Sequence, residues 1–117
     1  MLSISALGGN LKHKSPLALL ILVALASNIV LADIAPNRQA EIIHLLKHDC
    51  GSCHGMRLEG GLGPALVAKR FTKWDTDQLA FTILYGRPGT PMPPWRPFLT
   101  DNEAHWLATQ LKEGIKP

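Results

Sequence analysis

Two cysteines and a histidine form a motif whose spacing is specific for one kind of chemistry. Cys50 and Cys53 are separated by Gly51 and Ser52, and His54 follows directly. This Cys-x-x-Cys-His pattern is typical of covalent haem attachment. Each thiol adds across one haem vinyl group, and the histidine that follows offers its imidazole to the iron. The pattern therefore predicts one haem c, held by Cys50 and Cys53 with His54 on the iron.

Three other uses of a Cys-x-x-Cys pair remain open on the residues alone. A redox dithiol is normally accompanied by a β-α-β pattern, which this sequence lacks. For zinc, the cysteines, His44, His48 and His54 are a dense group of potential ligands. A disulfide would close a strained four-residue loop and stabilise little. None of these alternatives accounts for the long loops of the chain, so haem is the favoured interpretation.

A methionine in a proline-rich loop is the candidate for the second iron ligand. Met92 lies in the segment Pro91–Pro94, where prolines fix φ and stiffen the backbone. Met56 is only two residues from His54 and would lie on the same side of the haem. The alternative for Met92 is a buried gap-filling side chain. Two strong protein ligands leave no iron position for a substrate, so His54 and Met92 together predict an electron carrier and not an enzyme.

The first 32 residues have the features of a secretory signal. Lys12 and Lys14 precede an apolar run from Pro16 to Leu31, and small residues before Asp33 suit a signal peptidase. The run is interrupted by polar residues and is shorter than the about 20 apolar residues of a membrane span. We expect residues 1–32 to be cleaved, and residues 33–117 to be a cytochrome domain in the periplasm without a membrane anchor.

Three stretches with helical periodicity, separated by Gly- and Pro-rich loops, predict an all-α domain of three to four short helices. The first runs from Pro36 to His48 and ends before Cys50. The second covers Thr76 to Tyr85, after an N-cap at Asp75 and before Gly86. The third follows a capping box that begins at Thr100 and stops at Gly114. The predicted inward faces consist of Ile42, Leu45 and Leu46, then Leu79, Ile83 and Leu84, then Ala104, Leu107, Ala108 and Leu111.

Size and charge limit the possible functions further. A domain spanning only residues 33–117 is marginally stable without a disulfide, metal or cofactor, so a haem would supply much of its core. Without the two lysines of the signal, ten basic residues balance nine acidic ones, and no basic run remains. This balance argues against a nucleic-acid partner. We expect a monomer.

The order of these motifs resembles the class I c-type cytochromes over almost all of residues 33–116. The resemblance implies an N-terminal helix leading into Cys50–His54, then Gly63-Pro64, the Met92 loop and a C-terminal helix. In that family the proline that matches Pro64 gives its carbonyl to the axial histidine, which orients the ring. Pro64 thus joins the expected cofactor-binding residues. One departure is Gln110, where related cytochromes often have an aromatic residue, for which Trp106 could compensate.

Within that family, residues 48–58, 60–66 and 86–93 are similar to the small periplasmic cytochromes of the c55X type. These occur with the haem-c, haem-d dissimilatory nitrite reductase of denitrifying bacteria. The resemblance implies electron delivery to that reductase, with a role in maturing its haem d cofactor as the alternative. A haem-based ligand sensor is a further alternative. Arg57, Arg87 and Arg96 flank the predicted haem ligands in sequence, and their charges are candidates for docking a redox partner. The alternatives are solvated surface residues or clamps on the haem propionates.

Overall fold

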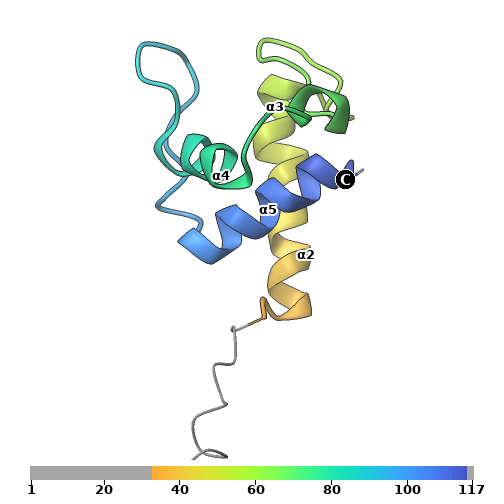
Figure 1. Cartoon of the computed structure of the whole chain (residues 1–117), viewed down its shortest axis with the longest axis vertical. Helices are drawn as coiled ribbons and strands as arrows, with labels where there is room; N and C mark the ends of the chain where they lie inside the picture. The colour runs from red at the N-terminus through yellow and green to blue at the C-terminus, as the bar shows by residue number, and fades with distance from the viewer. Residues whose placement is uncertain (1–32, 116–117) are drawn as a thin grey trace, which may run out of the picture. The chain divides into compact units, whose positions relative to one another are not determined.

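The computed structural model describes residues 33–115, and the predicted signal peptide lies outside these residues. Within the described range the chain is helical without strands, which confirms the all-α prediction (Figure 1). No helix in this range is long and apolar enough to cross a membrane. The elements are α2 (Pro36–Leu45), the π turn η1 (Leu46–Cys50), α3 (Gly51–His54), the 3-10 turn η2 (Ala68–Phe71), α4 (Thr76–Tyr85) and α5 (Asp101–Glu113).

The first helical segment is longer than predicted. The sequence suggested a helix that ends at His48, before the cysteine motif, but α2 continues through η1 into α3 and ends at His54. The prediction failed because Gly51 and Ser52 have weak helix propensity and suggested a turn. The backbone instead stays helical and widens into one π turn over Leu46–Cys50. The whole haem motif is therefore part of a helix.

The second and third helices have the predicted boundaries because their caps are local. Asp75 caps α4 by accepting a hydrogen bond from the Asp77 backbone N–H at 3.0 Å. Thr100 and Glu103 form the predicted capping box of α5, and Gly114 ends α5 in the left-handed conformation. These groups satisfy backbone donors and acceptors that the helix ends leave unpaired. The short turn η2 is an element that the periodicity did not predict.

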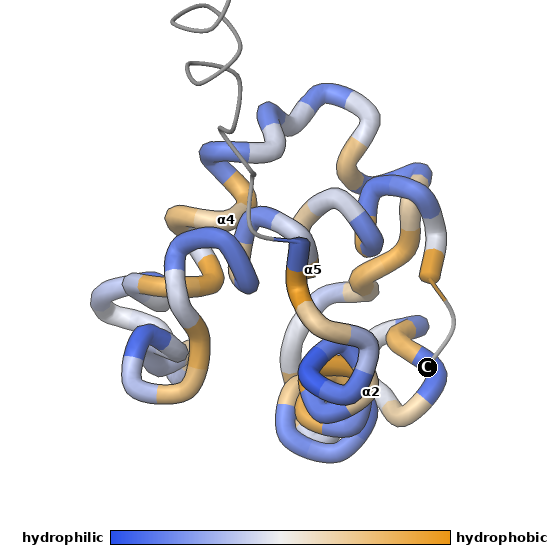
Figure 2. Tube along the Cα trace, turned by 90° about the horizontal axis from the view of Figure 1, so that it is seen from below, coloured by the Kyte–Doolittle hydropathy of each residue, from blue (hydrophilic) through white to orange (hydrophobic). Residues whose placement is uncertain are grey.

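The hydrophobic core is formed mainly by the inward faces of these helices. Figure 2, in which α2 is viewed nearly along its axis, shows hydrophobic and hydrophilic residues alternating around that helix. All of the predicted inward residues are buried except Leu45, which is partly exposed. Trp106 packs against the core, whereas Gln110 bonds to Glu113 within its own helix at 3.2 Å. The fully buried residues Ala104 and Ala108 present small side chains on the buried face of α5.

Candidate haem site

The imidazole of His54 is buried and held in one orientation. His54 is the last residue of α3, and its Nδ1 lies 2.6 Å from the carbonyl oxygen of Pro64. A carbonyl can only accept, so Nδ1 carries the proton and donates it. Nε2 has no hydrogen-bond partner among residues 33–115. Its lone pair is thereby free to bind a metal, and the contact between Pro64 and His54 that the resemblance implies is present.

The loop after the motif folds back onto the histidine. The Gly63 N–H donates to the Cys53 carbonyl at 2.8 Å, and the Gly60 N–H donates to the His54 carbonyl at 2.7 Å. A Cβ on Gly63 would lie only 2.8 Å from Nδ1 and Cε1 of the His54 ring. Only a residue without a side chain allows this approach. The loop is therefore a cradle that fits the ring and brings the Pro64 carbonyl to it.

Both cysteines of the motif are free thiols on the same helical turn. Cys50 is partly buried and Cys53 is exposed. Burial, together with the nearby Asp49 carboxylate, raises the pKa of the Cys50 thiol to about 11. Catalytic Cys-x-x-Cys pairs have lowered thiol pKa values, so this environment disfavours the dithiol alternative. The separation of the two thiols by one helical turn fits attachment to two neighbouring vinyl groups.

The zinc alternative is not supported by the geometry of the histidines. Among residues 33–115, no three His, Cys, Asp or Glu side chains converge in a way that could hold a metal ion. A structural zinc site needs four such ligands. His44 and His48 lie beside one another, but they do not join the cysteines and His54 in one cluster.

Met92 lies in a closed loop that connects α4 to α5. The Arg87 N–H donates to the Met92 carbonyl at 3.2 Å, and the Met92 N–H donates to the Thr90 hydroxyl at 3.4 Å. Gly86 is buried with φ +67°, and a Cβ there would lie 2.6 Å from the Met92 carbonyl oxygen. Met92 itself is partly exposed. Figure 1 shows this loop and the loop after α3 at the same end of the described unit, and the iron-ligand role of Met92 stays a prediction.

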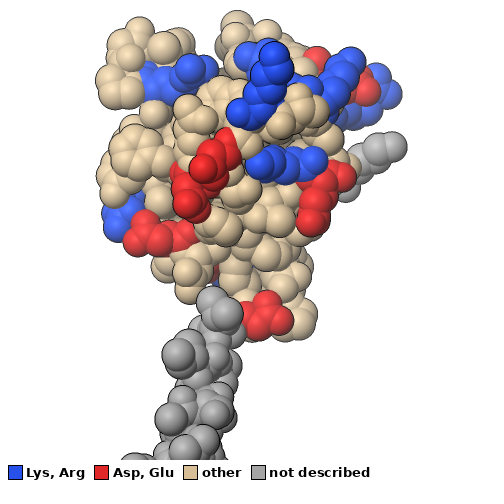
Figure 3. Space-filling view, in the orientation of Figure 1, with Lys and Arg blue, Asp and Glu red and all other residues tan. Residues whose placement is uncertain are grey.

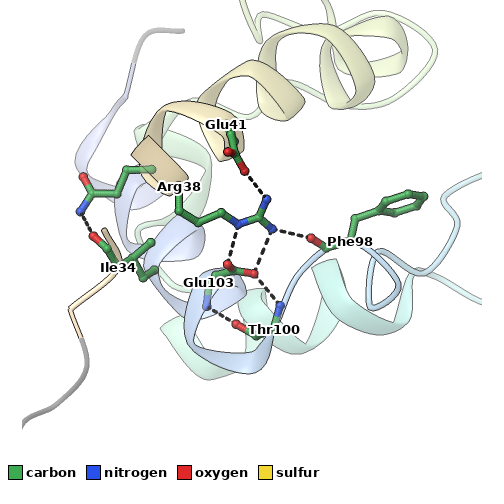
Figure 4. Close-up of polar contacts among 7 residues, drawn as sticks. Ile34, Arg38, Glu41, Phe98, Thr100 and Glu103 are labelled. Atoms are coloured by element: carbon green, nitrogen blue, oxygen red, sulfur yellow. Dashed lines mark hydrogen bonds and ion pairs between the residues drawn. The ribbon is translucent and has the colours of Figure 1, made fainter. Parts of the chain in front are cut away.

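The far end of the Met92 loop is anchored by an ion-pair network that sequence reasoning missed (Figure 4). Arg38 on α2 donates to Glu103 on α5 at 2.7 Å and to the Phe98 carbonyl at 2.8 Å. Glu41 accepts a further hydrogen bond from Arg38 at 2.8 Å. Glu103 also completes the capping box with Thr100. The network therefore joins α2, α5 and the last residues before α5. Arg38 is 65 residues from Glu103 and 60 from Phe98, which is too far for the sequence pattern to pair them.

The charged side chains are distributed unevenly on the face of the described unit that Figure 3 shows. Figure 3 shows Lys and Arg side chains gathered near the end where the two loops lie, while Asp and Glu are mostly found nearer the helices. Two of the predicted docking arginines have ion-pair partners: Arg96 contacts Asp101 at 2.7 Å, and Arg57 contacts Glu59 at 3.3 Å. The third predicted docking arginine, Arg87, is exposed and forms no ion pair with any residue between 33 and 115. The same holds for four other exposed basic residues, which are Lys47 in η1 and Lys69, Arg70 and Lys73 in and directly after η2.

Together, the oriented histidine, the glycine cradle and the two free thiols on one helical turn fit a covalently attached haem. An all-α domain with this motif is a c-type cytochrome. The chain belongs to the cytochrome family whose model is described as cytochrome c oxidase, cbb3-type, subunit III, and which matches residues 37–109. The cofactor is accordingly one covalent haem c with its iron, and the protein is an electron carrier.

Relatives within this family agree with the resemblance seen in the sequence. Cytochrome c55X of Pseudomonas aeruginosa is 52% identical over 86 residues, which cover 72% of each chain. The solved structure of a c-type cytochrome NirC has a TM-score of 0.70 and 50% identity, covering 72% of this chain and 100% of that chain. The dihydro-heme d1 dehydrogenase of Pseudomonas aeruginosa is 32% identical over 93 residues, covering 80% of this chain and 19% of that protein. The described domain thus resembles both free small cytochromes and one part of a larger enzyme.

Proposed function

We propose that this cytochrome carries electrons in the periplasm to a dissimilatory nitrite reductase. The observation that carries the proposal is the similarity, at about half of the residues, to cytochrome c55X and to NirC over the whole cytochrome domain. The signal-like residues 1–32 support a periplasmic location. When bound, the haem supplies a reversible one-electron couple of its iron.

The roles that we propose for the residues follow from their positions. Cys50 and Cys53 would hold the haem, and His54, oriented by the Pro64 carbonyl, would bind the iron through Nε2. Met92 would be the second ligand. Two protein ligands keep the iron coordination similar in both oxidation states, which favours fast electron transfer and leaves no position for a substrate.

We expect the exposed basic residues in and directly after η2 to guide the partner. Lys69, Arg70 and Lys73 are exposed and have no ion-pair partner in the described part of the chain, so their charges are available to an acidic surface. Such steering raises association rates and weakens with salt, because the Debye length is about 8 Å at physiological ionic strength. The protein therefore needs no tight complex, and each encounter can be short.

Stopped-flow oxidation of the reduced cytochrome by purified nitrite reductase tests this function. We expect rapid transfer that slows with rising ionic strength. The triple variant Lys69→Gln/Arg70→Gln/Lys73→Gln should transfer more slowly at low salt and with a weaker salt dependence. Arg96→Gln is the control, because Arg96 is already paired with Asp101. Failure of the wild-type cytochrome to reduce the reductase at any ionic strength would exclude this partner.

A second candidate function is electron exchange during maturation of the haem d cofactor. It is favoured by the 32% identity to one part of a dihydro-heme d1 dehydrogenase. A dehydrogenase must pass on the electrons that it removes, and a small free cytochrome of similar structure is a suitable acceptor. The same stopped-flow apparatus decides between the candidates, because reduction of the oxidised cytochrome by that dehydrogenase and its substrate would support the second.

A further inference from the structure

Two histidines lie beside one another on the exposed side of the first helical segment, outside the haem site. His44 belongs to the last turn of α2, and His48 lies four residues later in the π turn η1. Their ring centroids are 4.2 Å apart and the ring planes are inclined by 42°. Both side chains are exposed. Neither forms a hydrogen bond or ion pair with a residue of the described range, so their ring nitrogens are available to a ligand from solvent.

Imidazole is the commonest protein ligand for transition metals. Residues four apart on a helix are neighbours on its surface, and two histidines at this spacing can bind one metal ion together. Nitrogen ligands of this type suit Zn²⁺, Cu²⁺ and Ni²⁺. Once one imidazole has bound the metal, the second is present at a high effective concentration. The affinity of the pair for the metal is therefore higher than that of a single histidine.

We propose that His44 and His48 form a surface site for a divalent first-row transition-metal cation, which binds Cu²⁺ more tightly than Zn²⁺. The order of affinity follows the general stability series for nitrogen ligands. No third His, Cys, Asp or Glu of residues 33–115 joins the pair. Water must then complete the coordination sphere, so the site is open and its metal exchanges with solvent.

The local backbone gives the pair an unusual setting. The π turn that contains His48 also contains Cys50, one of the two predicted haem-attachment residues. Single π turns within helices are rare and are frequent at functional sites. The metal would therefore be held on the same helical segment that leads into the haem motif, although the haem ligands themselves take no part in the site.

The test uses the tag-free holocytochrome in its ferric state. Zn²⁺ binding is measured by isothermal titration calorimetry, and Cu²⁺ coordination by electron paramagnetic resonance. We expect one equivalent of metal, with hyperfine structure from two nitrogens for Cu²⁺. His44→Gln and His48→Gln should each weaken binding about 100-fold, because each leaves a single imidazole. His105→Gln is the matched control, since His105 is exposed on another helix, where it pairs with Asp77 at 3.0 Å.

The haem absorption spectrum and melting temperature of each variant check that the domain is intact. The proposal is overturned if the wild type binds metal no more tightly than His44→Gln/His48→Gln. It is also overturned if His105→Gln loses as much affinity as the single variants, because the metal would then be bound elsewhere. Retained binding in His105→Gln, with loss in both His44→Gln and His48→Gln, supports it.

Discussion

At the scale of single residues, Gly63 approaches the His54 ring so closely that a Cβ there would lie 2.8 Å from the imidazole. Gly63 lies in a conformation open to other residues, so its requirement for glycine is steric. A methyl group there would overlap the imidazole, and either the ring or the loop that carries Pro64 must move. The hydrogen bond to Pro64 sets the direction of the ring. This movement would therefore change the orientation of the imidazole toward the iron.

We therefore predict that Gly63→Ala destabilises the holoprotein by about 1–3 kcal/mol, the usual cost of overpacking. The haem stays attached through the cysteines, but its absorption bands should shift. Thermal unfolding and visible spectra measure both effects. Gly89→Ala is the control, because Gly89 has positive φ but nothing lies within 4 Å of the position that a methyl group would take there. Wild-type stability and absorption bands in Gly63→Ala would contradict the prediction.

A second prediction at this scale concerns Met92. Met92→Ala should abolish weak red absorption from sulfur ligation in the ferric protein, lower the reduction potential and allow carbon monoxide to bind the ferrous iron. Covalent haem content should not change, since the cysteines remain. Visible spectroscopy and redox titration provide the measurements, with Met56→Ala as the control. Spectra identical to those of the wild type would show that another group binds the iron.

At the scale of elements, the Arg38–Glu103 pair connects the first and last helices. The Glu103 side chain is 12% exposed and that of Arg38 35%. Hydrogen bonding from Arg38 lowers the pKa of Glu103 to about 2, from an ordinary value of 4.5. The stabilisation is therefore complete above about pH 4.5 and is lost as the pH falls towards 2, where the folded carboxylate is protonated.

We predict that Glu103→Gln lowers the free energy of unfolding at pH 7 by about 1–3 kcal/mol, which is less than for a fully buried pair because Arg38 is partly exposed. The variant should also show a smaller loss of stability between pH 4.5 and 2. Denaturant unfolding over this pH range measures both. Asp101→Asn, which breaks the exposed pair with Arg96, is the control and should have a clearly smaller effect, because solvent screens that pair. An unchanged acid dependence in Glu103→Gln would contradict this assignment.

At the scale of the whole molecule, the haem is expected to be part of the core. The predicted domain of residues 33–117 has a size that usually needs a cofactor or cross-link for stability. Cys50→Ala/Cys53→Ala should therefore leave a chain without haem and with little cooperative structure. Haem staining after denaturing electrophoresis and far-ultraviolet circular dichroism provide the measurements. A haem-free double variant with native helicity and a sharp thermal transition would show that the helices are stable alone.

The haem motif, the helices α4 and α5 and the family could all be predicted from the amino-acid sequence. These features are local: a Cys-x-x-Cys-His spacing, an N-cap at Asp75 and a capping box at Thr100 each involve residues a few positions apart. The same local information predicted the end of the first helix too early. Gly51 and Ser52 have weak helix propensity, but the chain stays helical through both residues.

Contacts between residues far apart in the sequence could not be predicted and are seen in the folded structure. Arg38 and Glu103 are 65 residues apart in sequence, and no periodicity pairs them. The contact of Gly63 with the His54 ring depends on how the intervening loop folds back. Among the predicted docking arginines, Arg96 pairs with Asp101, whereas Arg87 forms no ion pair in the described chain. Each outcome depends on the relative positions of separate segments, which are set by packing and not by local propensity.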